Sequence, residues 1–143
     1  MNKIKLRINR LFNYIFGEKF KKKLDYKWEN YPTRIKIIQE IIEYKKYKRY
    51  LEIGCDNDDL FSKIKIDLKI GVDPISGGTL RTTSDNFFKT NKDLFDIVFI
   101  DGLHHYEQVK KDVFNSLNCI EENGVIILHD CIPKSYLEQA VPR

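Results

Sequence analysis

The sequence has few of the features that mark secreted or membrane-spanning proteins. Its three cysteines, Cys55, Cys119 and Cys131, are an odd number without a CxxC spacing, which argues against a disulfide framework and against a structural zinc site. No apolar run approaches the roughly 18 residues that a membrane-spanning helix needs. Hydrophobic residues still make up 42% of the 143 residues, which is enough to build a core. We therefore expect one soluble, cytoplasmic domain.

Positive charge is concentrated at the N-terminus. Residues 1–50 hold 15 Lys and Arg against 5 Asp and Glu, whereas residues 51–143 hold 10 against 16. Apolar residues at three- and four-residue spacings predict a basic amphipathic helix within residues 1–24. We divide the chain into an N-terminal helical arm, 1–27, and a domain, 28–143. The arm either packs on the domain or a second subunit, or contacts an anionic membrane surface. No nucleic-acid recognition motif accompanies the charge, so no nucleic-acid partner is expected.

Short β-rich runs alternate with helical ones along the rest of the chain. A helix with Thr33 as its cap is expected in TRIKIIQEIIEYKKY, and the turn EENG is expected before the last strand, GVIIL. FDIVFI and GVIIL are continuously apolar, which is typical of strands buried on both faces of a parallel sheet. The pattern predicts an α/β fold, a Rossmann-like open parallel sheet that binds ligands at the carboxyl ends of its strands.

The first two strand ends indicate a nucleoside ligand. Glu52 and Gly54 follow the first strand, and Asp73 ends the second; a glycine lets the backbone approach a ligand, and an acid there accepts ribose hydroxyls. The dinucleotide motif GxGxxG is absent, and the sequence GCDNDD would repel a pyrophosphate. An NAD-dependent oxidoreductase is therefore a weak alternative. S-adenosylmethionine has no phosphate, and its sulfonium and ammonium groups tolerate nearby carboxylates.

Several motifs together resemble the class I S-adenosylmethionine-dependent methyltransferases, in the subgroup with IDGxHxY and LHD motifs. They are, in order, YLEIGC, GVDP, TSDNFF, FDIVFIDGLHHYEQVKKD and NGVIILHDCIP, within residues 28–143. The resemblance implies the strand order 3-2-1-4-5. It also implies which residues bind the cofactor. Glu52, Gly54 and Cys55 are expected at its methionine end, Asp73 at its ribose, and Ser84 and Asp85 near its adenine. Asp56 and Asp58 stand where the family pattern ExGxGxG has its second and third glycines.

The resemblance also implies residues at the methyl acceptor. Asp101 and His104 follow the fourth strand, with His104 as the general base, and Asp101 and Asp130 are the expected ligands of a Mg²⁺ ion. His129 stands where the metal-dependent members have an acid. The expected reaction is O-methylation of a sugar or another small hydroxylated metabolite, with metal assistance left open. In the alternative interpretation, Asp101 and Asp130 cap helices or turns, and Cys55 is a small apolar core residue.

Strands six and seven of this family have no counterpart in the sequence. We expect a C-terminally truncated domain in which GVIIL forms an exposed apolar edge, available for homo-oligomer formation. A non-catalytic Rossmann-like fragment or interaction module that no longer binds the cofactor is therefore the alternative to an enzyme.

Overall fold

A computed structural model describes residues 8, 11–12, 15–16 and 27–132. The chain divides into two compact units, Pro32–His129 and a second formed by Met1–Tyr31 with Asp130–Arg143. Most of the basic helix expected within residues 1–24 lies outside the described residues, so the membrane contact expected of it stays a prediction. Within the described part of the chain, no helix is long and apolar enough to cross a membrane.

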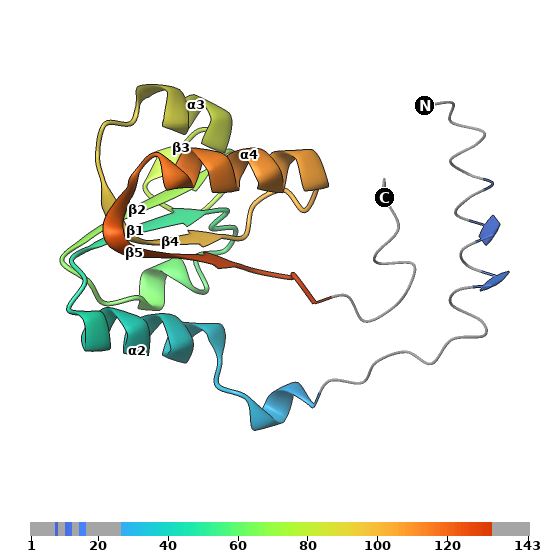
Figure 1. The fold of residues 1–143 in the computed structure, drawn as a ribbon, viewed down its shortest axis with the longest axis horizontal. Helices are drawn as coiled ribbons and strands as arrows, with labels where there is room; N and C mark the ends of the chain where they lie inside the picture. The colour runs from blue at the N-terminus through green and yellow to red at the C-terminus, as the bar shows by residue number, and fades with distance from the viewer. Residues whose placement is uncertain (1–7, 9–10, 13–14, 17–26, 133–143) are drawn as a thin grey trace. The chain divides into compact units, whose positions relative to one another are not determined.

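Five parallel strands form one sheet in the Pro32–His129 unit, in the order β3-β2-β1-β4-β5. Helix α2 covers one face of this sheet, and α3 and α4 cover the other (Figure 1). This arrangement confirms the predicted Rossmann-like fold and its strand order. The elements, after η2 (Trp28–Asn30) of the other unit, are α2 (Arg34–Lys45), β1 (Arg49–Ile53), η3 (Phe61–Lys63), β2 (Leu68–Asp73), β3 (Leu80–Arg81), α3 (Ser84–Thr90), β4 (Phe95–Ile100), α4 (Tyr106–Leu117) and β5 (Ile120–Leu128).

Helix α2 begins and ends through local chemistry that the sequence predicts in part. The Thr33 side chain accepts a hydrogen bond from the Lys36 amide at 3.3 Å, which confirms the predicted N-cap. At the other end, Lys46 adopts a left-handed conformation with φ of 59°, and its amide bonds back to the last turn. The buried residues Ile38 and Ile42 lie four positions apart, so they share the face that packs on the sheet.

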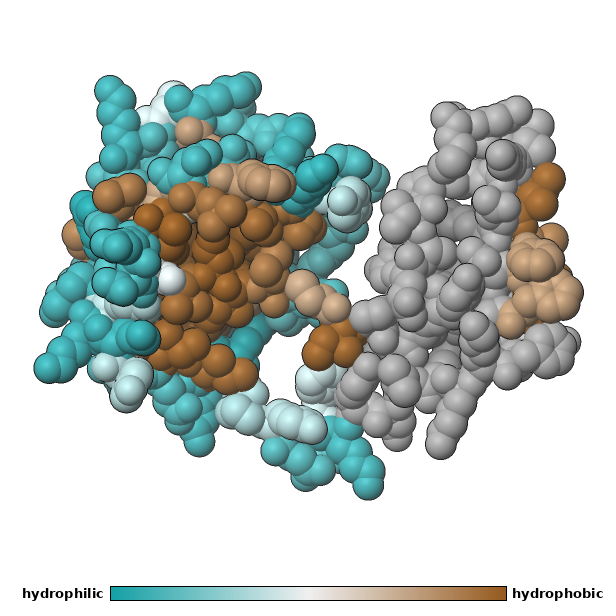
Figure 2. Space-filling view, in the orientation of Figure 1, coloured by the Kyte–Doolittle hydropathy of each residue, from teal (hydrophilic) through white to brown (hydrophobic). Residues whose placement is uncertain are grey.

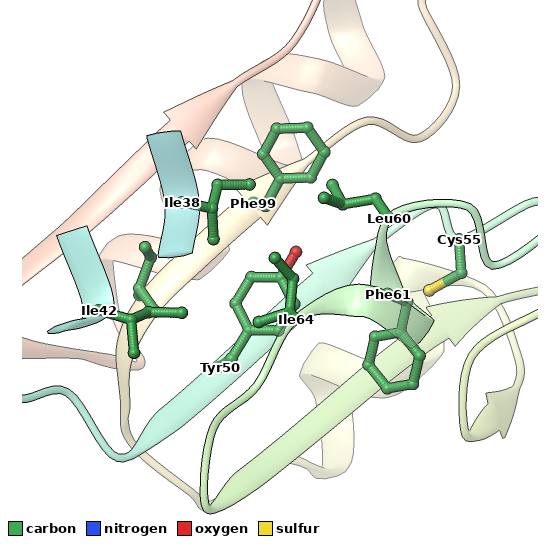
Figure 3. Close-up of a cluster of buried hydrophobic side chains, with 9 residues drawn as sticks. Ile38, Ile42, Tyr50, Cys55, Leu60, Phe61, Ile64 and Phe99 are labelled. Atoms are coloured by element: carbon green, nitrogen blue, oxygen red, sulfur yellow. The ribbon is translucent and has the colours of Figure 1, made fainter. Parts of the chain in front are cut away.

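The core lies on both faces of the sheet. On the α2 face, Ile38 and Ile42 point toward Tyr50 of β1 and Ile64, with Phe99 of β4 beside them (Figure 3). A second cluster on the α3 and α4 face includes Leu51, Ile53, Val72, Phe87, Phe95, Val98, Ile100 and Cys119. Strands β1 and β4 supply residues to both clusters, and burial on both faces accounts for the apolar run FDIVFI that becomes β4.

The last strand differs from its prediction in two ways. EENG is not a separate turn before it, because β5 already pairs with β4 at Ile120, and the extra residues bulge out before pairing resumes at Val125. The Tyr47 hydroxyl donates a hydrogen bond to the Asn123 carbonyl in this bulge. The apolar residues 125–127 are only half-buried, so the burial on both faces that their continuous run predicts is wrong. The expected apolar edge is confirmed, because β5 is an edge strand of the described sheet. Figure 2 shows the resulting hydrophobic surface over β5, between α4 and α2.

Candidate functional site

The turn after β1 has the backbone shape of a glycine-rich loop. Gly54 has φ of 85°, and a Cβ atom there would lie 2.3 Å from the Asp101 carbonyl oxygen, so only glycine fits. Asp56 and Asp58 also adopt left-handed conformations, with φ of 44° and 63°. Aspartate is among the few residues other than glycine that enter this region readily. The two aspartates therefore stand in the conformations that glycine favours.

Asp73 lies beside this turn and holds it in place. Its Oδ2 atom accepts hydrogen bonds from the amides of Cys55 and Asp56, both at 3.1 Å. Its Oδ1 atom accepts from the amides of Ile75 and Ser76, at 2.8 and 2.9 Å. Burial raises the pKa of Asp73, but the four N–H donors outweigh burial and lower it below the usual value. A carboxylate has about four lone-pair sites, so these amides already occupy them.

The loop after β2 packs directly on the turn after β1. The Asp58 side chain accepts a hydrogen bond from the Gly78 amide at 2.6 Å. A Cβ atom on Gly77 would lie 2.4 Å from the Asp56 carbonyl oxygen, so the two loops are in close backbone contact. Asp58 therefore joins the two loops through its side chain.

Glu52 is a buried carboxyl group at the end of β1, with a side chain 1% exposed. The Tyr50 hydroxyl donates a hydrogen bond to its Oε2 atom. Burial raises the pKa of Glu52 to about 7, against the lowering effects of Tyr50 and of the Arg34 charge. Burial likewise raises the pKa of the Cys55 thiol well above its usual range, so this cysteine stays neutral, as a core residue does.

Three basic side chains surround Asp101, in the loop after β4. Arg34 Nη1 lies 3.1 Å from Oδ2. His129 Nδ1 lies 3.0 Å from Oδ1, and His104 Nε2 lies 3.4 Å from the same oxygen. The structure thus brings the predicted pair Asp101 and His104 together, and His104 is half exposed. The alternative role of Asp101 as a helix cap is not what its contacts show, since His105 is the N-cap residue of α4.

Sequence reasoning missed Arg34, although its position holds a usable signal. Arg34 and Lys36 lie in the first turn of α2, which has no acidic residue. A cation at a helix N-terminus opposes the helix dipole, so an arginine there calls for a partner outside the helix. That partner is Asp101, 67 residues further along the chain.

Ser84 and Asp85, the residues predicted near adenine, begin α3 and bond to α4. The two N–H groups of Gln108 Nε2 are shared among three acceptors: Ser84 Oγ at 3.2 Å, Asp85 Oδ1 at 3.0 Å and Asp112 Oδ1 at 3.1 Å. The hydrogen bond from Gln108 lowers the pKa of Asp85, and the nearby Lys111 lowers it further. Burial raises the pKa of Asp112. Gln108 and Asp112 were not predicted as part of the site. Their i, i+4 spacing in α4 is the one sequence feature that could have indicated that their side chains interact.

The described residues contain no group of three or more His, Cys, Asp or Glu side chains arranged to hold a metal ion. Asp130, the second predicted magnesium ligand, belongs to the other compact unit, where it has a left-handed φ of 51°. The pairing of Asp101 with Asp130 around a metal therefore stays a prediction.

Comparison with known proteins identifies one family. The profile of the family described as "Methyltransferase domain" matches residues 43–131, which is more than half of the chain. The match covers the strand ends of β1, β2, β4 and β5, and leaves out Arg34. A search of curated proteins finds no match.

Proposed function

This chain belongs to the methyltransferase domain family, and we propose that it transfers a methyl group from S-adenosylmethionine to a hydroxyl oxygen of a sugar or another small metabolite. The observation that supports this proposal best is the juxtaposition at the ends of β1, β2 and β4. The left-handed turn at Gly54 lies directly against Asp73 on one side and against the Asp101 backbone on the other.

The residues at these strand ends suit the cofactor in charge. When bound, the cofactor supplies an electrophilic methyl group on a sulfonium. Glu52 and Asp101 favour positive charge near the turn, and ionised Glu52 attracts it more strongly than the protonated form. Asp73 stays ionised at neutral pH because its amide bonds lower its pKa, so its charge is fixed at the end of β2. Ribose hydroxyls would share its oxygens with the amides of the turn.

Asp101 and His104 support a general-base role at the acceptor. A hydroxyl must lose its proton as its oxygen is methylated, and histidine is the side chain that most often accepts such a proton. His104 lies 3.4 Å from the Asp101 carboxylate, whose negative charge stabilises the imidazolium that then forms. The half-exposed position of His104 leaves its ring accessible to a substrate.

A magnesium ion at Asp101 has less support. Both oxygens of this carboxylate already contact nitrogen atoms of basic side chains, Arg34 on one oxygen and two histidines on the other. Mg²⁺ prefers oxygen ligands and a near-octahedral shell, which these nitrogen neighbours do not provide. The proposed reaction therefore includes no metal-dependent step.

The second candidate function is a non-catalytic interaction module, which the four amide bonds to Asp73 favour because they compete with ribose. Calorimetric titration with S-adenosylhomocysteine separates the two. Binding in the micromolar range, together with methyl transfer to a panel of hydroxylated acceptors, is expected of the enzyme. An absence of binding heat at high protein concentration would leave only the interaction module.

A further inference from the structure

We propose that Arg34 binds the α-carboxylate of the methionyl part of the cofactor, and so selects ligands that carry an intact amino-acid end. This inference rests on the proposed function. It assigns a cofactor contact to a residue that lies outside the matched family region and that neither the strand-end motifs nor their spacing predict.

Arg34 lies close to two acidic groups. Its guanidinium contacts Asp101 at the end of β4, and its charge also acts on the buried Glu52 at the end of β1. Glu52 lies in β1 and Asp101 directly follows β4, the strand that pairs with β1 from Tyr50 to Ile53. One permanent cation and two carboxyl groups are therefore grouped at one end of the sheet, on α2, in the loop after β4 and on β1.

This grouping matches the charges of an amino acid. The methionyl end of the cofactor is a zwitterion with an ammonium group and a carboxylate. Glu52 and Asp101 suit the ammonium group, whereas they would repel a carboxylate unless a nearby cation offsets their charge. Arg34 is a cation close to both acidic groups.

The guanidinium also has donors to spare for such a ligand. It has five N–H donors in a planar fork, and among the described residues its hydrogen bonds involve Nη1 alone. A guanidinium can bind a carboxylate through two parallel N–H···O bonds, a geometry that the ammonium group of lysine lacks. The Arg34 side chain is 41% exposed, so a ligand can reach it.

The alternative is that Arg34 only forms an ion pair with Asp101. In this role Arg34 contacts no ligand, so it cannot distinguish ligands by their amino-acid end. Its contribution to stability would also be small, as for other partly exposed ion pairs. The two roles are separated by ligands that differ only in the amino-acid end. S-adenosylhomocysteine has both the carboxylate and the ammonium group, its decarboxylated analogue keeps only the ammonium group, and 5′-methylthioadenosine has neither.

The experiment is calorimetric titration of the full chain with these three ligands, for the wild type, Arg34→Gln, Arg34→Lys and the control Lys36→Gln. Lys36 lies in the same helical turn, and its side chain is 65% exposed and paired with Glu40. We expect the wild type and Lys36→Gln to bind S-adenosylhomocysteine about 10- to 100-fold more tightly than the decarboxylated analogue, as a charge-assisted hydrogen-bonded pair implies. Arg34→Gln should lose this preference, with the affinity for the two smaller ligands unchanged, and Arg34→Lys should keep part of it.

Equal preference in the wild type and Arg34→Gln would overturn the inference, and so would an equal loss of affinity for all three ligands. If the wild type binds none of the three, the proposed function itself fails, which is a different result from binding without discrimination. Thermal melting of each variant shows whether it is folded, and Arg34→Lys retains the ion pair with Asp101 if the glutamine variant unfolds.

Discussion

The buried carboxyl group of Glu52 makes the stability of this protein depend on pH in a predictable way. Burial raises its pKa from an ordinary 4.5 to about 7 in the folded chain. Between these two pH values the native state holds a proton that the unfolded state has lost. As pH rises through this window, the free energy of unfolding therefore falls by about 1.4 kcal/mol per pH unit. Above and below the window, the Glu52 contribution no longer changes with pH.

Glu52→Gln removes this titration while keeping the size of the side chain and an oxygen that accepts from the Tyr50 hydroxyl. Near pH 5 the variant and the wild type should have similar stability, because protonated Glu52 resembles glutamine. By pH 8 the variant should be more stable by about 2 to 3 kcal/mol, since only the wild type then has a buried charge. Urea unfolding followed by circular dichroism, at several pH values from 5 to 8, measures this difference.

Glu122→Gln is the matched control, because Glu122 is exposed in the bulge of β5. Its stability difference from the wild type should not change with pH. The other titratable groups are the same in the wild type and Glu52→Gln, so their contributions cancel in the difference. A Glu52→Gln difference that stays constant within about 0.5 kcal/mol from pH 5 to 8 would refute the assigned pKa.

Three further predictions concern the neighbouring features. Asp73→Asn should lower the free energy of unfolding at pH 7 by about 2 to 3 kcal/mol, because the amide loses acceptors for the four backbone N–H groups; an unchanged urea midpoint would contradict this. EDTA should leave S-adenosylhomocysteine binding and methyl transfer unchanged, because basic side chains surround Asp101; a loss that Mg²⁺ restores would support the metal site instead. The apolar edge of β5 should drive self-association, so the wild type should sediment as a dimer or larger and Ile126→Lys as a monomer, whereas a monomeric wild type at high concentration would rule this edge out as an interface.

The sequence predicts the sheet well because its strands are specified locally. The runs that become β1, β2 and β4 are rich in β-branched, aromatic and leucine residues, and each ends at or just before a glycine or an acidic residue. The start of β5 was predicted wrongly because EENG has the composition of a turn. Its outcome depends on a register shift against β4 and on Tyr47, which is 76 residues away in sequence from its hydrogen-bond partner Asn123.

The candidate site is predictable only as far as strand ends determine it. Their positions at or directly after the ends of strands identify four site residues, and the pairing of these strands brings them to one edge of the sheet: Glu52, Gly54, Asp73 and Asp101. Most partners of these residues do not follow, because they depend on contacts between segments that are distant in sequence. The Tyr50–Glu52 contact is the exception, since residues two apart in a strand share a face of the sheet. No local pattern shows that Arg34 reaches Asp101, or that four amides from two loops converge on Asp73.

The contacts of Asp73 and Asp58 change how a cofactor site in this chain should be tested. In the simplest view, Asp73 contacts only the ribose, and a substitution of Asp73 abolishes cofactor binding without other effects. Here Asp73 and Asp58 also fasten the loop after β2 to the turn after β1, so a variant at either position alters the shape of the turn together with any contact to a ligand. Loss of binding in Asp73→Asn would therefore not identify a ribose contact. Arg34 and Glu52 are better probes, because their side chains contact other side chains rather than the backbone of the turn.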